Sequence, residues 1–256
     1  MKKGQVTIFV VLGIILIALA SLFFFARRTV LLPTTTENLQ GELVSIRNHI
    51  EECVQRGKND YGLLEIVNKI GKQGGYLQPA QDTFRLWNDS KVSYLCFNIP
   101  QTEACYNRLR TSQEIEKEIA TEISNVLEGC LDIQSFGQLR PYNIQENERT
   151  INTTIRREEV QVTVKAPITL VASNNRVSLE EVQTKLEVPL GEILEVTNDI
   201  LDAETTDGEF ETLFYMIDKK GRIKIYKQRP YPDKIYIIKK EGSPYTFQFA
   251  VQGEPR

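Results

Sequence analysis

Histidine is nearly absent from this sequence, because His49 is the one histidine among 256 residues. A Ser/His/Asp triad would have to use it, and no serine lies in a Gly-x-Ser-x-Gly motif. The glycine-rich stretch GKQGG, residues 71–75, lacks the spacing and the final Lys-Ser/Thr of a phosphate-binding loop. We therefore expect no catalytic residues, no cofactor and no enzymatic activity.

Metal-binding spacings are missing as well, since no two of the four cysteines form a Cys-x-x-Cys pair. His49, Glu52 and Cys53 lie within one helical turn, so a metal site there is conceivable. Three or four ligands would have to converge on it, and Cys53 is better explained as a disulfide partner. We expect no metal site.

The sequence also lacks an excess of either charge. Lys and Arg number 31 and Asp and Glu number 34, which gives a formal net charge of −3. A nucleic-acid-binding surface usually shows as a basic excess, so we expect no nucleic-acid partner. Apolar residues make up 41% and charged residues 25%, a balance typical of folded domains.

Basic residues and tyrosines do alternate near the carboxyl end. The basic residues are Lys219, Lys220, Lys224, Lys227, Arg229, Lys234, Lys239 and Lys240, and the tyrosines are Tyr215, Tyr226, Tyr231, Tyr236 and Tyr245. This pattern fits a face for an anionic polymer or for lipid headgroups. It also fits strands whose outward lysines discourage edge pairing, and we favour that interpretation.

One long apolar run is present. Ile8–Ala26 holds 19 residues without charge or proline, and a helix of that length spans roughly 28 Å, close to the hydrocarbon core of a bilayer. We therefore expect a single membrane-spanning helix. Lys2 and Lys3 flank one end and Arg27 and Arg28 the other, so the positive-inside rule alone does not orient it.

The cysteines indicate the orientation. Cys53, Cys96, Cys105 and Cys130 all follow the apolar run, and an even count suggests two disulfides in an oxidising compartment. We therefore place the amino terminus in the cytoplasm and the carboxyl-terminal domain outside the cell. Four unrelated buried thiols remain the alternative. Two glycosylation sequons, at Asn88 and Asn152, match the number expected by chance and do not decide the compartment.

The helical pattern suggests which cysteines pair. Apolar residues recur every three or four positions after Glu37 and again after Ser112, the expected N-cap of its helix. Cys53 and Cys130 fall near the ends of these two helices, each on the apolar face. Of the three possible connectivities we choose Cys53–Cys130 and Cys96–Cys105.

The remaining pattern indicates an α+β fold. We expect a signal or transmembrane helix over residues 1–28, a linker over 29–36, a helical disulfide-stapled region over 37–135 and an α+β region over 136–256. A further helix is expected over residues 61–70 and another over 191–205. Alternating segments predict mostly antiparallel strands at residues 83–99, 151–164, 176–190, 222–228, 234–240 and 245–251.

The amino-terminal stretch KKGQ, followed directly by the apolar run, resembles the class III signal of archaeal type IV prepilins and archaellins. The resemblance covers about 25 residues. It implies a prepilin peptidase as a partner and cleavage after Gly4, which would leave Gln5 as the new amino terminus. Many pilins carry a glutamate at the fifth mature position, whereas this sequence has Phe9 there, as in archaellins, which also lack that glutamate.

A broader resemblance covers most of the chain. The stretches KKGQVTIF, IEECVQ, GKQGGYL, VLEGCL and YTFQFAV are similar to those of a group of membrane-anchored archaeal surface proteins. This resemblance implies an exterior location and brings no established activity.

The sequence therefore predicts a membrane-anchored, surface-exposed archaeal protein, a pilin-like or cell-envelope structural or adhesion component. Expected partners are membrane lipid and further copies of the chain or pilin-like subunits. The alternatives are a tethered extracellular ligand-binding or enzymatic module and an uncleaved single-pass anchor that does not polymerise.

Overall fold

The computed structural model describes residues 13–22, 36–98, 105–137 and 142–253. Within these ranges no helix is long and apolar enough to cross a membrane. This finding contradicts the transmembrane or pilin-like helix in the expected fold class, so that part of the prediction is wrong. Residues 13–22, the part of the expected span that the structure describes, are helical. The other residues of the expected span Ile8–Ala26 lie outside the described ranges.

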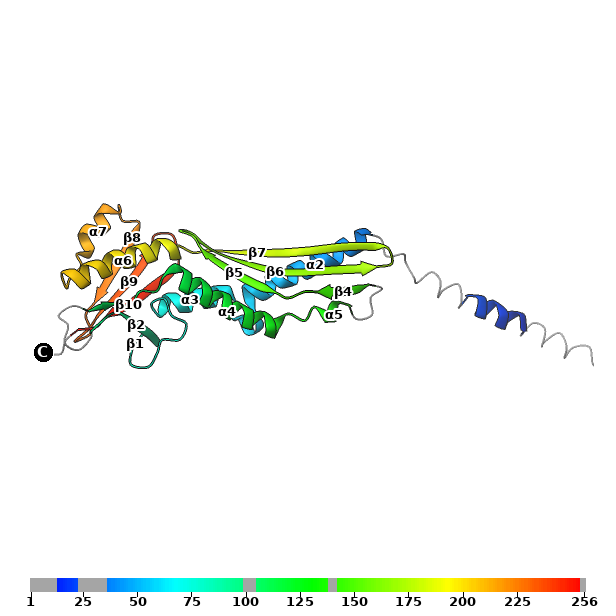
Figure 1. Cartoon of the computed structure of the whole chain (residues 1–256), viewed down its shortest axis with the longest axis horizontal. Coiled ribbons are helices and arrows are strands. Elements are labelled where there is room, and N and C mark those ends of the chain that lie inside the picture. The colour runs from blue at the N-terminus through cyan, green and yellow to red at the C-terminus, as the bar shows by residue number, and fades with distance from the viewer. Residues whose placement is uncertain (1–12, 23–35, 99–104, 138–141, 254–256) are drawn as a thin grey trace, which may run out of the picture.

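The α+β character is present, with two sheets arranged end to end along the long axis of the molecule (Figure 1). The first, the long sheet, has β6 (Glu159–Ala172) at its centre. β7 (Asn175–Glu187) pairs along one side of β6, and β5 (Thr150–Ile155) and β4 (Asn143–Glu146) share the other side. All of these pairings are antiparallel, as the alternating sequence predicts.

The long sheet buries one face because its residues alternate. Val160, Val162 and Val164 of β6 are buried, whereas the residues between them are partly exposed. α2 (Thr36–Arg56) and α4 (Ser112–Cys130) cover this sheet, α2 mainly along β7 and α4 along β5. The Glu116 carboxylate accepts the backbone N–H of Ile155 at 2.7 Å, so α4 also satisfies a backbone group at the end of β5.

The second sheet, the mixed sheet, has the order β1-β2-β10-β9-β8. The strands are β1 (Phe84–Trp87), β2 (Ser90–Phe97), β8 (Ile223–Gln228), β9 (Lys234–Lys240) and β10 (Thr246–Val251), and the short β3 (Tyr106–Asn107) also pairs with β2. β2 and β10 run parallel, whereas the other pairings of this sheet are antiparallel, as expected for a mostly antiparallel arrangement. Strands more than 150 residues apart give no local signal for such a pairing.

Helices α3 (Leu63–Lys72), α6 (Leu190–Thr206) and α7 (Thr212–Asp218) accompany the mixed sheet. α3 packs on β10, α6 contacts β2, β9 and β10, and α7 lies against β8. The remaining short elements are η1 (Lys58–Asp60) and α5 (Gln134–Gly137). One continuous hydrophobic core includes Ile50, Ile119, Val162 and Phe249, so residues of both expected regions, 37–135 and 136–256, contribute to it.

The loop after α3 packs against β2 and β10 of the mixed sheet. Gly74 and Gly75 adopt φ of 70° and 91°, in the left-handed region that favours glycine. The Cα of Gly74 lies so close to β2 and β10 that an added Cβ would be 3.3 Å from the Ser93 and Phe249 side chains. The GKQGG stretch therefore packs closely against the paired strands β2 and β10.

Candidate functional site

The two disulfides lie where the sequence places them. Cys53 at the end of α2 bonds to Cys130 at the end of α4, with Cα atoms 5.8 Å apart. Cys96 of β2 bonds to Cys105 just before β3, with Cα atoms 5.2 Å apart. The expectation of two disulfides is confirmed, and the pairs are Cys53–Cys130 and Cys96–Cys105. The first bond joins the two helices that cover the long sheet.

His49 packs beside the first disulfide. Its Nε2 lies 3.8 Å from the Cys53 sulfur, and its ring centroid lies 5.4 Å from that of Phe136. Because Cys53 is disulfide-bonded, its thiolate is not available to a metal. Across the described ranges no group of three His, Cys, Asp or Glu side chains could hold a metal ion.

The expected processing residues, Gly4 and Gln5, lie outside the described residues. Both sequon asparagines are at the surface: Asn88 is exposed in the turn between β1 and β2, and Asn152 is exposed on β5. Both asparagines are therefore accessible for modification.

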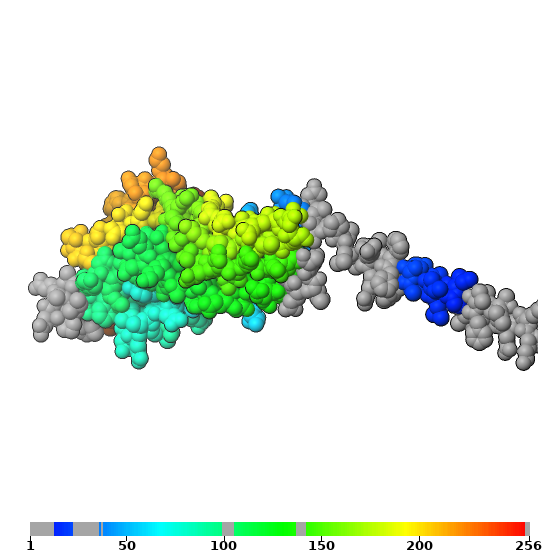
Figure 2. Space-filling model, turned by 45° about the vertical axis from the view of Figure 1, so that its right-hand side comes forward, coloured from blue at the N-terminus to red at the C-terminus, as the bar shows by residue number. Residues whose placement is uncertain are grey.

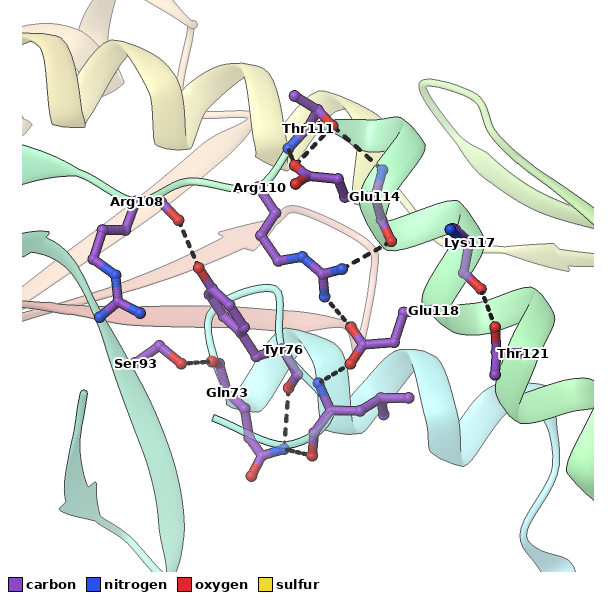
Figure 3. Close-up of polar contacts among 11 residues, drawn as sticks. Gln73, Tyr76, Ser93, Arg108, Arg110, Thr111, Glu114, Lys117, Glu118 and Thr121 are labelled. Atoms are coloured by element: carbon purple, nitrogen blue, oxygen red, sulfur yellow. Dashed lines mark hydrogen bonds and ion pairs between the residues drawn. The ribbon is translucent and has the colours of Figure 1, made fainter. Parts of the chain in front are cut away.

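A groove of about 520 Å³ opens between α4 and the loop that follows α3. Figure 3 shows its polar contacts: Arg110 forms an ion pair with Glu118, and the other oxygen of Glu118 accepts the backbone N–H of Leu77 at 3.3 Å. Tyr76 donates to the carbonyl of Arg108 at 2.8 Å. The charged side chains that line the groove thus hold the loop against α4.

The same view shows how α4 begins. The backbone N–H of Glu114 donates to the Thr111 hydroxyl at 3.3 Å, and the Glu114 carboxylate accepts the backbone N–H of Thr111 at 2.8 Å (Figure 3). This capping box places the N-cap at Thr111, one residue before the expected Ser112. These hydrogen bonds lower the pKa of the Glu114 carboxyl.

A second groove, of about 760 Å³, lies between the β5–β6 turn and the β9–β10 turn. Beside it Glu192 of α6, almost fully buried, accepts from Arg157 at 3.0 Å and from Lys240 at 2.8 Å. Lys240 also pairs with Glu158. Burial opposes ionisation of Glu192, but the hydrogen bonds from Lys240 and Arg157 outweigh it and hold its pKa below the ordinary value. The cluster ties α6 to both turns.

A third charged cluster surrounds the end of α6 beside a groove of about 570 Å³. Glu204 accepts from Tyr236 and, at 2.6 Å, from Lys234. Glu209 pairs with Lys234 at 3.0 Å, with Arg229 at 2.7 Å and with Lys227. Burial disfavours ionised Glu209, yet hydrogen bonds from Lys227 and Lys234 lower its pKa to about 2.

The tyrosines and lysines near the carboxyl end therefore divide into two classes. Tyr236 and Tyr245 are buried, and burial raises the pKa of both hydroxyls. Lys227, Lys234 and Lys240 pair with carboxylates. The exposed residues Lys220, Arg222, Lys224 and Lys239 have no ion pair to any part of the chain that the structure describes. The interpretation as outward lysines of alternating strands holds for Lys224 and Lys239 and fails for the paired ones.

Helix α7 is the surface feature that the sequence analysis misses. It exposes Leu213, Phe214 and Ile217, whereas Tyr215 and Met216 pack against the core. Seven residues make too short a segment for a clear helical period, and the run TLFYMI also fits a strand.

Comparison with protein-family models, with curated proteins and with solved structures finds no match to the chain.

Proposed function

We propose that the chain is a surface-exposed structural or adhesion component of an archaeal cell envelope, held at the membrane by its amino-terminal apolar segment. The observation that carries this proposal is the pair of disulfides, Cys53–Cys130 and Cys96–Cys105. Disulfides persist in oxidising, external compartments and are rare where thiol reductants operate. The α+β domain therefore works outside the cytosol.

The described part of the apolar segment supports attachment. Ile14, Leu16, Ile17 and Leu22 are all more than half exposed on the helix of residues 13–22. Apolar side chains gathered in this way are usually covered by lipid or by another protein surface. In the proposal, membrane lipid covers them.

The role is structural rather than catalytic. The charged side chains of the three grooves pair with one another: Arg110 with Glu118, Lys240 with Glu192, and Lys234 with Glu204. Lys240 and Lys234 each connect β9 to α6, whereas Arg110 and Glu118 connect the start of α4 to its second turn, and such pairs rigidify an extracellular body. A catalytic site would instead present groups poised toward a substrate.

The test is surface accessibility in intact cells that produce the chain. A membrane-impermeant amine reagent should label exposed lysines such as Lys224 and Lys239 before lysis, at the level seen after lysis. A cytosolic protein in the same cells is the control and should be labelled only after lysis. Labelling that appears only after lysis would refute an external domain.

A second candidate function, a pilin-like subunit, is favoured by the KKGQ stretch before the apolar run. In this version prepilin peptidase cuts after Gly4, and Gln5 becomes the amino terminus. Amino-terminal sequencing of the native protein decides the matter, because an uncleaved anchor begins at Met1. A Gly4→Leu variant should block cleavage, whereas Gly13→Leu, a matched change within the apolar run, should not.

A further inference from the structure

Helix α7 carries an apolar ridge on the outside of the molecule. Leu213, Phe214 and Ile217 are 61%, 71% and 64% exposed. Three large apolar side chains so exposed on seven residues differ from single apolar residues scattered over a surface, which are common. In Figure 2, α7 projects from the body of the protein in orange.

The ridge is held in place by the rest of the helix. Tyr215 donates to Asp199 of α6 at 2.7 Å, and its ring lies 5.3 Å from that of Phe210. The sulfur of Met216 accepts the backbone N–H of Ile225 at 3.2 Å, so α7 lies along the edge of β8 that β9 leaves open. The exposed residues therefore belong to an anchored helix.

Unpaired cations follow directly along the chain. Lys220 and Arg222 lie in the turn after α7, and Lys224 on β8 is opposite Lys239 on β9. All four are exposed, and none has a side-chain ion pair to a described residue. Two like charges directly opposite each other destabilise a sheet. By contrast, the nearby Lys227 and Lys234 are both paired.

The acidic residues near the ridge do not neutralise these cations. Asp218 lies 3.8 Å from Lys219, and Glu211 and Glu241 are exposed without an ion pair to the described part of the chain. Asp199, exposed on α6, accepts the hydrogen bond from Tyr215. The surface therefore combines exposed cations that have no ion pair to the described residues with an apolar centre.

We propose that this surface, Leu213, Phe214 and Ile217 with Lys220, Arg222, Lys224 and Lys239, docks onto an anionic lipid surface. Apolar side chains on one face of a short helix enter the boundary between headgroups and acyl chains, and flanking lysines bind anionic headgroups. A nucleic acid or an anionic polymer would use the cations and leave the apolar ridge in water. A lipid surface can contact both the cations and the apolar ridge.

The position of α7 gives this docking a direction. α7 lies at the end of the molecule opposite the start of α2, the helix that follows the amino-terminal segment (Figure 1). α7 projects sideways from the body, so its ridge can meet a lipid surface that lies alongside the molecule, whether or not the amino-terminal segment is anchored in a membrane (Figure 1). Lipid docking by α7 does not depend on that anchoring, so it can be tested by itself.

The test uses the full chain in nanodiscs of neutral phosphatidylcholine, which occupy the amino-terminal apolar segment. Binding to added vesicles is measured by co-flotation, with phosphatidylcholine alone or mixed with phosphatidylglycerol. We expect at least about tenfold more binding to the anionic vesicles, because each basic residue near a membrane contributes measurably. Salt at 0.5 M should abolish the difference, since it shortens the Debye length to a few ångströms.

Two double variants separate the contributions. Phe214→Ser with Ile217→Ser should reduce binding to anionic vesicles at least about fivefold, because the apolar insertion is lost. Lys220→Glu with Lys224→Glu should reduce it at least about tenfold. The matched controls are Val44→Ser with Leu64→Ser and Lys58→Glu with Lys117→Glu, which alter exposed residues elsewhere. The apolar variant and both controls should unfold at the wild-type temperature, since the changed side chains are exposed. Lys220→Glu with Lys224→Glu should unfold at or above it, because a carboxylate at position 224 lies opposite Lys239.

Equal binding to neutral and anionic vesicles would overturn the proposal. So would wild-type binding by the Phe214/Ile217 variant. Soluble polyphosphate serves as the competing ligand. If it displaces the vesicles while the apolar variant binds normally, the surface recognises an anionic polymer, and lipid docking is wrong.

Discussion

The long sheet and the mixed sheet differ in how many of their faces are buried. The long sheet packs one face under α2 and α4 and leaves the other to polar side chains such as Asn152, Thr163 and Gln183, which align across three strands. The mixed sheet is apolar on both faces. On β9, Tyr236 and its neighbour Ile235 are both fully buried, although they point to opposite sides.

The buried and half-buried charged clusters also differ in position between the two sheets. The clusters around Glu192, Glu204 and Glu209 lie where α6 meets the mixed sheet or the turns at its edge. The apolar ridge of α7 also belongs to this half. If α7 docks as proposed, the mixed-sheet half presents the surface that meets a partner, and the long-sheet half supports it.

Removing a disulfide should affect the two halves unequally. Cys53→Ser with Cys130→Ser opens a link between residues 77 apart, whereas the Cys96–Cys105 link spans 9. On the chain-entropy model the first pair contributes about 4.5 kcal/mol to the free energy of unfolding and the second about 2.7 kcal/mol. Urea unfolding of both double-serine variants measures the difference. Equal losses would show that the long-range link does not act through the unfolded chain.

Adding a side chain at Gly74, where the GKQGG loop packs against β2 and β10, should destabilise the protein. Gly74→Ala places a Cβ at positive φ and 3.3 Å from three neighbouring atoms. We expect a loss of about 2 kcal/mol in the free energy of unfolding. Gly129→Ala is the matched control: it lies within α4 with no atom within 4 Å of the added Cβ, and it should stabilise the protein by about 0.5–1 kcal/mol. If both variants had the same stability, the positive φ and the close packing at Gly74 would not penalise a side chain there.

Acid should release the Glu209 cluster. The pKa of Glu209 is about 2 in the folded protein and near 4.5 when unfolded, so its ion pairs stabilise the fold fully above about pH 5. This stabilisation is lost as the pH falls from 5 toward 2. The carboxylate is 36% exposed, and solvent screening reduces its contribution to about 1 kcal/mol.

Glu209→Gln checks this contribution. The variant should be less stable than wild type at pH 7, and its free energy of unfolding should decline less steeply between pH 5 and pH 2. Glu211→Gln is the control, because Glu211 is exposed without an ion pair to the described residues. Identical pH profiles for wild type and Glu209→Gln would contradict the assignment.

Local patterns predicted the elements whose signals are local. The stripes that predicted α2 and α4 are buried as expected at Ile46, Ile50, Ile119 and Ile123. The alternation over residues 151–164 predicted the β5–β6 hairpin, and the positions of Cys53 and Cys130 at helix ends pointed to their pairing. In each case burial of one face sets the period, and the period is visible in the sequence.

What the sequence could not show depends on distant residues. β2 pairs with β10, a strand more than 150 residues later in the sequence. Glu204 of α6 accepts a hydrogen bond from Tyr236 of β9, which is 32 residues away. Helix α7 was missed because the run TLFYMI is apolar on the exposed side as well, so it has no helical stripe. The amino-terminal transmembrane expectation relied on the length of an apolar run, whereas no helix among the described residues is both long and apolar enough to cross a membrane.

The most direct test of the external, disulfide-bonded domain is intact mass analysis of the native protein after thiol alkylation, with and without prior reduction. The account predicts no alkylated cysteine without reductant and four after unfolding and reduction, since all four cysteines are paired. Four thiols that react without reductant would contradict it, because a reduced domain has no need of an oxidising compartment.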